Sequence, residues 1–170
     1  MPTHTDLPEL ADLLPTSDVI DVKTVPAGSV TLREFVAGAL GSGSVASRAL
    51  FAIRVPLARL LRLDTAGMPD KTRLRPEDVS FTPGDPLSFF TVHRGEEDHY
   101  LLLKVVDNHL VAYLAIIVDE SGPERRFKVV TLVRYLRKAG RVYFELIRPF
   151  HHVVVRFMCR SGLRRSFPPA

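Results

Sequence analysis

The fold is decided by two segments near the end of the chain, Phe127-Lys-Val-Val-Thr-Leu-Val-Arg-Tyr-Leu-Arg137 and Arg141-Val-Tyr-Phe-Glu-Leu-Ile147. Both are rich in β-branched and aromatic residues, and the short polar turn Lys138-Ala139-Gly140 lies between them, so the pattern predicts a β-hairpin. The run that follows begins with Pro149, which suits the first turn of a helix, and continues with apolar residues at helical spacing. The last third of the chain therefore predicts a hairpin followed by a long terminal helix.

The same alternation of side chains recurs before this hairpin. Strands are predicted over 87–93, 99–106 and 110–118, and short polar turns separate them. Strands joined by such short turns are antiparallel neighbours, so these runs predict a meander. A further strand is predicted near the start of the chain, over 17–25.

Two short helices are predicted after this first strand. The first follows Thr31, which forms a capping box with Glu34, and the second covers about 44–63. Together these elements describe an α+β helix-grip fold, in which a curved antiparallel meander sheet is wrapped round a long C-terminal helix. We expect residues 1–16 to be a flexible N-terminal tail and residues 17–167 to form a single helix-grip domain.

The composition limits the class of protein. The chain has 170 residues, 46% of them hydrophobic, which suffices for one domain with a buried core. It contains neither a run of about 18 uncharged apolar residues nor a secretory signal, so we expect no transmembrane segment. Cys159 is the only cysteine, which excludes an internal disulfide and a Cys-rich zinc site and fits a cytoplasmic protein. Its apolar surroundings predict a buried structural thiol.

Positive charge is concentrated at the end of the chain. Residues 1–122 hold 11 Lys and Arg against 17 Asp and Glu, whereas residues 123–170 hold 12 against 2. Such asymmetry is typical of surfaces that bind nucleic acid or anionic membranes. Alternatively, acidic and basic strands become neighbours in the folded sheet and neutralise one another.

Two short motifs carry a resemblance to a known family. They are Asp107-Asn108-His109-Leu110 and the run from Gly140-Arg141-Val142-Tyr143-Phe144 to Ile147-Arg148-Pro149-Phe150-His151-His152. They resemble the bacterial domain-of-unknown-function family 2867, which looks like a branch of the START and birch-pollen-allergen-like (SRPBCC) superfamily. The resemblance implies a cavity between sheet and helix that binds apolar molecules. This chain departs from the family pattern at Val111 and Tyr113, where an acidic and a later basic residue are usual.

Several polar residues are candidates for chemistry. Asp107 and His109 lie on one side of a strand and form the best acid–base pair, although Asp107-Asn108 also suits a tight turn. Tyr143 and Glu145 would be catalytic or ligand-orienting groups if their side of the predicted strand faces the cavity, and exposed surface otherwise. The expected apolar ligand contacts on the terminal helix are Phe150, Val154, Phe157 and Met158.

The histidine pattern does not predict a metal site. No pair of histidines has the i, i+4 spacing of a zinc-binding helix, and the adjacent His151 and His152 point to different sides of a helix. One of these two histidines is expected to cap the terminal helix. The chain also lacks a phosphate-binding Gly-rich loop and a serine nucleophile elbow, which argues against nucleotide hydrolysis and common esterase chemistry. No cofactor is expected.

Three functional hypotheses follow. The leading one is a cytoplasmic protein that binds a hydrophobic small molecule, lipid-like or polyketide-like, in a cavity of roughly 300 Å³ or more. The second is a cyclase or dehydratase that uses the same cavity for proton transfer. The third is binding of an anionic membrane or, less expected, nucleic acid by the basic terminal helix. The sequence leaves the oligomeric state open.

Overall fold

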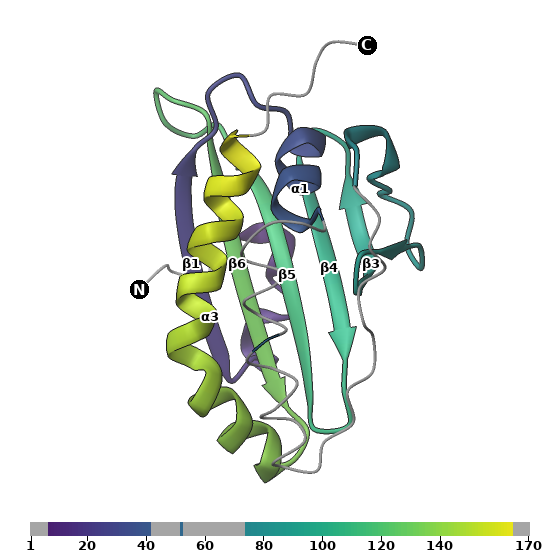
Figure 1. The fold of residues 1–170 in the computed structure, drawn as a ribbon, viewed down its shortest axis with the longest axis vertical. Coiled ribbons are helices and arrows are strands. Elements are labelled where there is room, and N and C mark those ends of the chain that lie inside the picture. Colours follow the sequence, from purple (N-terminus) through teal and green to yellow (C-terminus); the bar gives the residue numbers. More distant parts are fainter. Residues whose placement is uncertain (1–6, 42–51, 53–73, 165–170) are drawn as a thin grey trace.

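The protein is built round one antiparallel sheet. The computed structural model describes residues 7–41, 52 and 74–164, and its six strands lie in the order β1-β6-β5-β4-β3-β2 (Figure 1). This arrangement confirms the predicted α+β helix-grip architecture, because the meander closes onto the first strand and a long helix follows it. The strands are β1 (Val19–Pro26), β2 (Pro86–Leu87), β3 (Phe90–Glu96), β4 (Tyr100–Val106), β5 (Leu110–Asp119) and β6 (Arg126–Tyr135).

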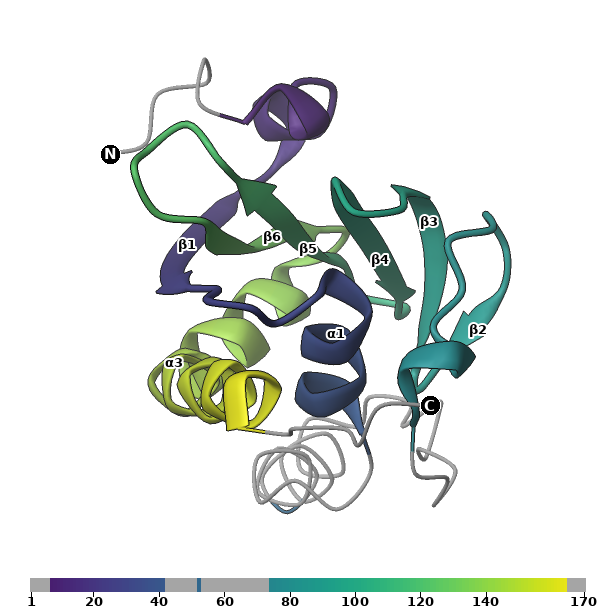
Figure 2. The ribbon, with the colours of Figure 1, turned by 90° about the horizontal axis from the view of Figure 1, so that it is seen from above.

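The described α-helices cover one face of this sheet. Figure 2 shows α1 (Leu32–Leu40) and α3 (Lys138–Arg164) on the same side, where α3 follows the β1 and β6 edge. The 3-10 helices η2 (Pro8–Leu10) and η3 (Leu14–Thr16) lie on the opposite side. The sheet therefore has two buried faces, and its main core lies between the strands and the two α-helices. None of the helices in the described residues is long and apolar enough to cross a lipid bilayer.

The predicted strand over 141–147 was wrong. These residues form the start of α3, which begins at Lys138 and runs for 27 residues. Alternation and helical spacing compete here, because Tyr143, Phe144 and Ile147 also stand at i, i+1 and i+4. The segment is helical because helical spacing places these three residues against the sheet, where Tyr143 and Phe144 are buried.

Pro149 consequently lies inside α3 and not in its first turn. A proline at an interior position lacks the N–H that would bond to the carbonyl one turn earlier, and its ring crowds the same carbonyl. Such positions are the usual places at which helices bend. Figure 1 shows that the axis of α3 changes direction between its two halves.

The contact between α1 and α3 depends on two glycines. A Cβ atom on Gly38 would lie 2.9 Å from the Cα atom of Gly162, and a Cβ on Gly162 would lie 2.7 Å from a ring carbon of Phe35. Real Cβ atoms do not approach other atoms this closely. The two helices therefore cross with their backbones in contact, which fixes the position of α3 over the sheet.

The N-terminal segment is packed from Leu7 onward. Leu7, Leu10 and Leu14 are at most 4% exposed and form a second core with Leu102 and Leu132 on the sheet face opposite α3. The flexible tail predicted for 1–16 thus does not extend over the described part of that range. The second predicted helix, over 44–63, falls almost wholly outside the described residues.

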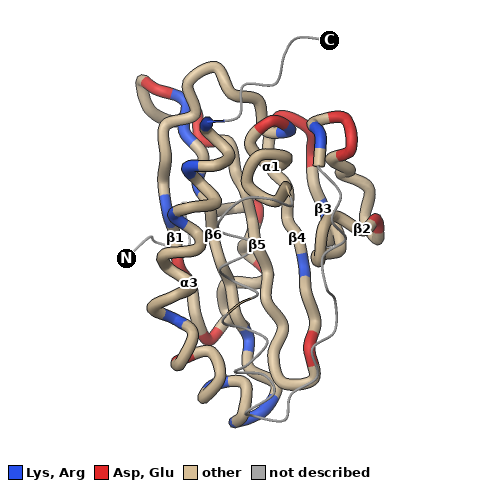
Figure 3. The backbone as a smooth tube through the Cα atoms, in the orientation of Figure 1, with Lys and Arg blue, Asp and Glu red and all other residues tan. Residues whose placement is uncertain are grey.

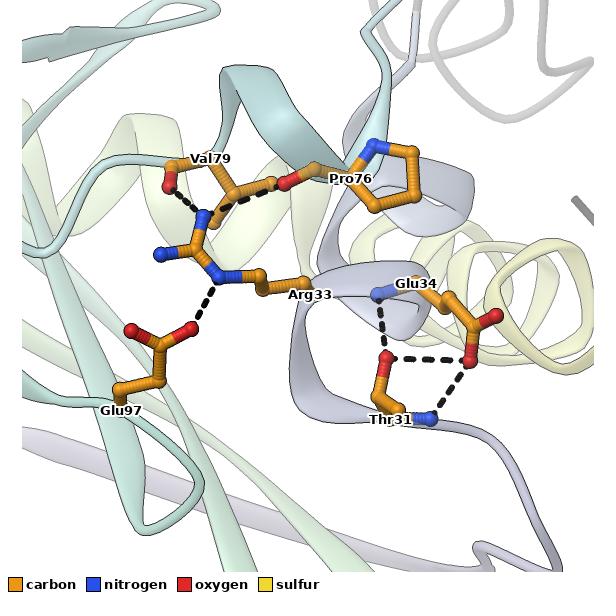
Figure 4. Close-up of polar contacts among 6 residues, drawn as sticks. All are labelled: Thr31, Arg33, Glu34, Pro76, Val79 and Glu97. Carbon is orange, nitrogen blue, oxygen red and sulfur yellow. Dashed lines mark hydrogen bonds and ion pairs between the residues drawn. The ribbon is translucent and has the colours of Figure 1, made fainter. Parts of the chain in front are cut away.

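The predicted capping box at the start of α1 is confirmed. The Thr31 hydroxyl accepts a hydrogen bond from the Glu34 backbone N–H at 3.2 Å, and the Glu34 carboxylate accepts one from the Thr31 N–H at 2.8 Å (Figure 4). These bonds satisfy N–H groups that a helix start otherwise leaves unpaired.

Arg33 ties α1 to two other parts of the chain. Its guanidinium donates to the carbonyls of Val79, at 2.6 Å, and Pro76, at 3.3 Å, and pairs with the carboxylate of Glu97 (Figure 4). Pro76 belongs to the short 3-10 helix η4 (Pro76–Asp78), and Glu97 follows β3. The arginine thus holds η4 and the β3–β4 turn against the first helix.

Candidate functional site

A pocket lies between α3 and the sheet. Its volume is about 110 Å³, and strands β3, β4, β5 and β6 supply one wall while α3 supplies the other. Among the described residues, the lining is mostly hydrophobic, and five of these lining residues carry polar side-chain atoms. The apolar lining residues are Phe89, Phe90, Val105, Leu110, Ala112, Leu114, Val133, Phe144, Ile147, Val154, Val155 and Met158, and the others are Asp107, Tyr113, Thr131, Tyr143 and His151.

Helical periodicity places the α3 wall of the pocket. The lining positions 143, 144, 147, 151, 154, 155 and 158 are three or four residues apart, or adjacent, so they lie on one side of the helix. Two polar residues, Tyr143 and His151, interrupt this otherwise apolar side. Because the same side packs against the sheet, a polar atom here must find a partner inside the protein or in a bound molecule.

Two polar atoms of the pocket lining are buried without a hydrogen-bond partner among the described residues. They are Oγ1 of Thr131 and Nδ1 of His151. Thr131 is 5% exposed and stands in β6, opposite Asp21 of β1 and Leu114 of β5. Buried groups of this kind are uncommon, and each one calls for a partner such as a water molecule or a ligand.

His151 is held in its neutral form. Burial lowers the pKa of its imidazole to about 4, and the nearby carboxylate of Asp21 opposes this shift only in part. The ring lies 5.6 Å from the ring of Phe144, measured between centroids. At neutral pH the pocket therefore contains an uncharged imidazole, whose Nδ1 donates or accepts a hydrogen bond according to the tautomer.

Of the predicted acid–base pair, one member lines the pocket and the other is buried beside Tyr143. Asp107 lines the pocket, and its backbone N–H donates to the Leu110 carbonyl at 2.9 Å, which closes the turn between β4 and β5. His109 is 2% exposed and does not line the pocket. Its ring meets the ring of Tyr143 edge to face, with centroids 5.0 Å apart. Its carbonyl accepts from Leu136 N–H at 2.9 Å, so its backbone anchors the turn before α3.

The six residues expected to contact a ligand divide into two groups. Tyr143, Val154 and Met158 line the pocket. Glu145, Phe150 and Phe157 are exposed on α3, and Glu145 forms an ion pair with Arg148 at 3.6 Å. The predicted pairing of Tyr143 with Glu145 on one face required a strand, and it fails because successive odd residues of a helix point in different directions.

Sequence reasoning missed the sheet residues that complete the site. Thr131 is flanked in β6 by Val129 and Val133, which also face the helix side. In the sequence, Thr131 is the polar residue between Val129 and Val133 at the alternate positions of this strand, and it interrupts their hydrophobic pattern. The buried Nδ1 of His151, by contrast, depends on the correct helix start and was not accessible from the sequence. The expected helix cap at His151 or His152 does not form, since both residues lie inside α3.

A second polar cluster joins the edge strand β1 to α3. The Lys23 ammonium pairs with the carboxylate of Asp21 and lies 3.1 Å from Nδ1 of His152, which is itself 3.5 Å from the Asp21 carboxylate. Asp21, His151 and His152 offer one ligand atom each within 4.8 Å of one another, so the adjacent histidines do converge on one carboxylate. Lys23 already supplies a positive charge to this group, and a metal ion would have to displace its ammonium.

Cys159 is a structural thiol. It is 3% exposed in the core between the sheet and the α-helices, and burial raises the pKa of the thiol to about 11. It is therefore protonated at neutral pH and is a poor nucleophile.

Comparisons with known proteins identify a family. No match was found among curated proteins. The proposed branch of the START and birch-pollen-allergen-like superfamily stays a prediction. The model of the family described as "Protein of unknown function (DUF2867)" matches residues 13–158, which include β1, the meander and most of α3. The chain therefore belongs to this family of proteins of unknown function.

Proposed function

We propose that the protein binds a small, uncharged and mainly apolar molecule in the pocket between the sheet and α3. One observation carries this proposal: an apolar pocket is lined by two residues with buried polar atoms that have no partner among the described residues, Thr131 Oγ1 and His151 Nδ1. A buried polar group without a hydrogen bond costs about 1–3 kcal/mol. A ligand with one hydroxyl or carbonyl group would remove part of this cost when it binds.

The volume of the pocket limits the size of the ligand. About 110 Å³ is less than the roughly 300 Å³ at the lower end for drug-sized ligand sites. An apolar cavity of about 150 Å³ in another protein holds benzene. The pocket therefore suits a molecule with a single ring or a short branched chain, which is smaller than the lipid-like or polyketide-like ligands expected from the sequence.

The charge of the lining limits the ligand further. His151 is neutral at physiological pH, and Asp107 is the acidic residue among the lining residues that the structure describes. A carboxylate ligand would be buried beside an acidic side chain and without a cationic partner among the described lining residues, which is strongly unfavourable. A phenol, a small cyclic alcohol or a small ketone is both small enough for the pocket and uncharged.

The proposal is tested with three probes of similar size in nuclear magnetic resonance titrations of ¹⁵N-labelled protein at neutral pH. Phenol carries the hydroxyl, benzene lacks it, and benzoate carries a charge. We expect saturable shifts at the amides of lining residues with phenol and benzene, and none with benzoate. The phenol hydroxyl satisfies at least one buried polar atom, so phenol should bind about tenfold more tightly than benzene.

Two variants and one control make the test specific. Thr131→Val keeps the shape of the side chain and removes the hydroxyl, so it should reduce the preference for phenol while leaving benzene binding intact. Ala112→Leu adds side-chain volume inside the pocket and should weaken both probes. Thr24→Val, at an exposed position of β1, should change neither. Absence of saturable shifts at the lining residues with every probe would contradict the proposal.

A further inference from the structure

The outer side of α3 carries a continuous row of large apolar side chains. Between 41% and 53% of the surface of each is exposed, whereas single exposed apolar residues are the norm on protein surfaces. Their spacing of three or four residues places them on one side of the helix, over a length of about 22 Å. The row consists of Val142, Leu146, Phe150, Val153 and Phe157, and we call it the α3 apolar row.

Positive side chains border the α3 apolar row. Arg156 and Arg160 each follow a member of the row by three residues, and Arg164 follows Phe157 by seven, so that it continues the same line. These three arginines are exposed and form no ion pair with any described residue. Figure 3 shows blue positions recurring along α3 from one end to the other. The outer face of the helix thus combines hydrophobic and cationic surface.

The composition of this face decides among three kinds of partner. A second copy of the chain would bring together two helices with six Lys and Arg and one Glu each, so like charges would repel. A nucleic acid would pair with the arginines and leave the apolar row in water. An anionic phospholipid surface satisfies both features, because acyl chains accept the apolar side chains and lipid phosphates pair with the arginines.

We propose that the outer face of α3 docks on an anionic phospholipid membrane. The α3 apolar row enters the boundary between headgroups and acyl chains, and Arg156, Arg160 and Arg164 lie at the level of the lipid phosphates. The helix lies in the plane of the surface, since it is not apolar enough to cross a bilayer. This interaction is independent of the pocket, which the opposite side of α3 lines.

The test is flotation of the full chain with two kinds of vesicle. One is pure phosphatidylcholine, and the other is an equimolar mixture of phosphatidylcholine and phosphatidylglycerol. We expect retention on the anionic vesicles, weak retention on the neutral ones, and loss of retention as salt is raised. Equal retention on both vesicles, or none on either, would overturn the proposal.

Two double variants separate the hydrophobic and ionic contributions. Leu146→Gln with Phe150→Gln should abolish retention on anionic vesicles. Arg156→Gln with Arg160→Gln should weaken partitioning by roughly 25-fold, since each basic residue near an anionic surface contributes about fivefold. All four positions are exposed, so the fold should persist, which circular dichroism checks.

The matched control removes the same charge elsewhere. Arg75 and Arg134 are exposed and lie outside α3, so Arg75→Gln with Arg134→Gln should retain most of the affinity. An equal loss in this control would show that net charge alone governs binding and would overturn the proposal. Two other results would also overturn it. In the first, the parent chain is a dimer that does not bind vesicles, and the variant with Leu146→Gln and Phe150→Gln is a monomer. In the second, the parent chain binds duplex DNA, and only the variant with Arg156→Gln and Arg160→Gln loses this binding.

Discussion

Replacing Thr131 with valine should stabilise the protein in the absence of ligand. The threonine is 5% exposed, and its hydroxyl is buried without a partner among the described residues, whereas the methyl group of valine fills the same space. Removal of an unsatisfied buried polar group is worth about 1–3 kcal/mol in the free energy of unfolding. For a domain of this size each kcal/mol raises Tm by roughly 3 °C, so we expect an increase of about 3–9 °C.

Urea denaturation followed by circular dichroism gives the free energy, and calorimetry gives Tm. The slope of the urea transition should not change, because the surface exposed on unfolding is the same. Thr24→Val is the matched control, since Thr24 is exposed in β1, and it should alter stability by less than about 0.5 kcal/mol. A loss of 1 kcal/mol or more in Thr131→Val would show that the hydroxyl already has a strong partner. In that case the Thr131 hydroxyl would not favour a ligand with a polar group.

Three further predictions concern stability. Burial lowers the pKa of His151 to about 4, below the value of about 6.5 in the unfolded chain, so stability present above pH 6.5 should fall as the pH approaches 4. Between pH 7 and 5 the parent protein should lose about 2 kcal/mol more than His151→Asn in urea titrations, and parallel curves would show that the histidine does not contribute. Gly162→Ala should destabilise by about 1–3 kcal/mol, because its Cβ would lie 2.7 Å from Phe35, although alanine is the better helix former. Arg160→Ala is its exposed control in thermal denaturation, and a stabilised Gly162→Ala protein would contradict the close contact of the helices. Thr31→Ala should cost about 1 kcal/mol through loss of the helix cap, measured by urea denaturation, and no change would mean that water replaces the cap without loss.

The sequence predicted the sheet better than the terminal helix. Strand alternation is a local property, and the turns between β3 and β6 are short, so neighbouring strands could be paired without knowledge of the rest of the fold. The segment 141–147 satisfied both alternation and helical spacing. Only its packing against the sheet decides between the two, and that packing is a tertiary effect which overrides local propensity.

For the same reason, the sequence predicted only part of the candidate site. Val154 and Met158 line the pocket, and they belong to the part of the terminal helix that the sequence predicted; their contact with a ligand stays a prediction. Phe150 and Phe157 were expected to face inward because they are hydrophobic, but they face outward and do not belong to the described pocket lining. The cluster of Asp21 with His152 joins residues far apart in the chain, and no local pattern indicates such a contact.

The pairing of β1 with β6 has a consequence during protein synthesis. Val19 lies opposite Val133 and Pro26 opposite Arg126, so roughly a hundred residues separate the two strands in the chain. On the ribosome, β1 emerges long before β6, its neighbour among the described strands, has been translated. Its hydrogen-bonding groups stay available to other nascent chains during that interval. Slow translation between the two strands should therefore lengthen the period in which this protein is prone to aggregation, and a chaperone that shields β1 should have its largest effect then.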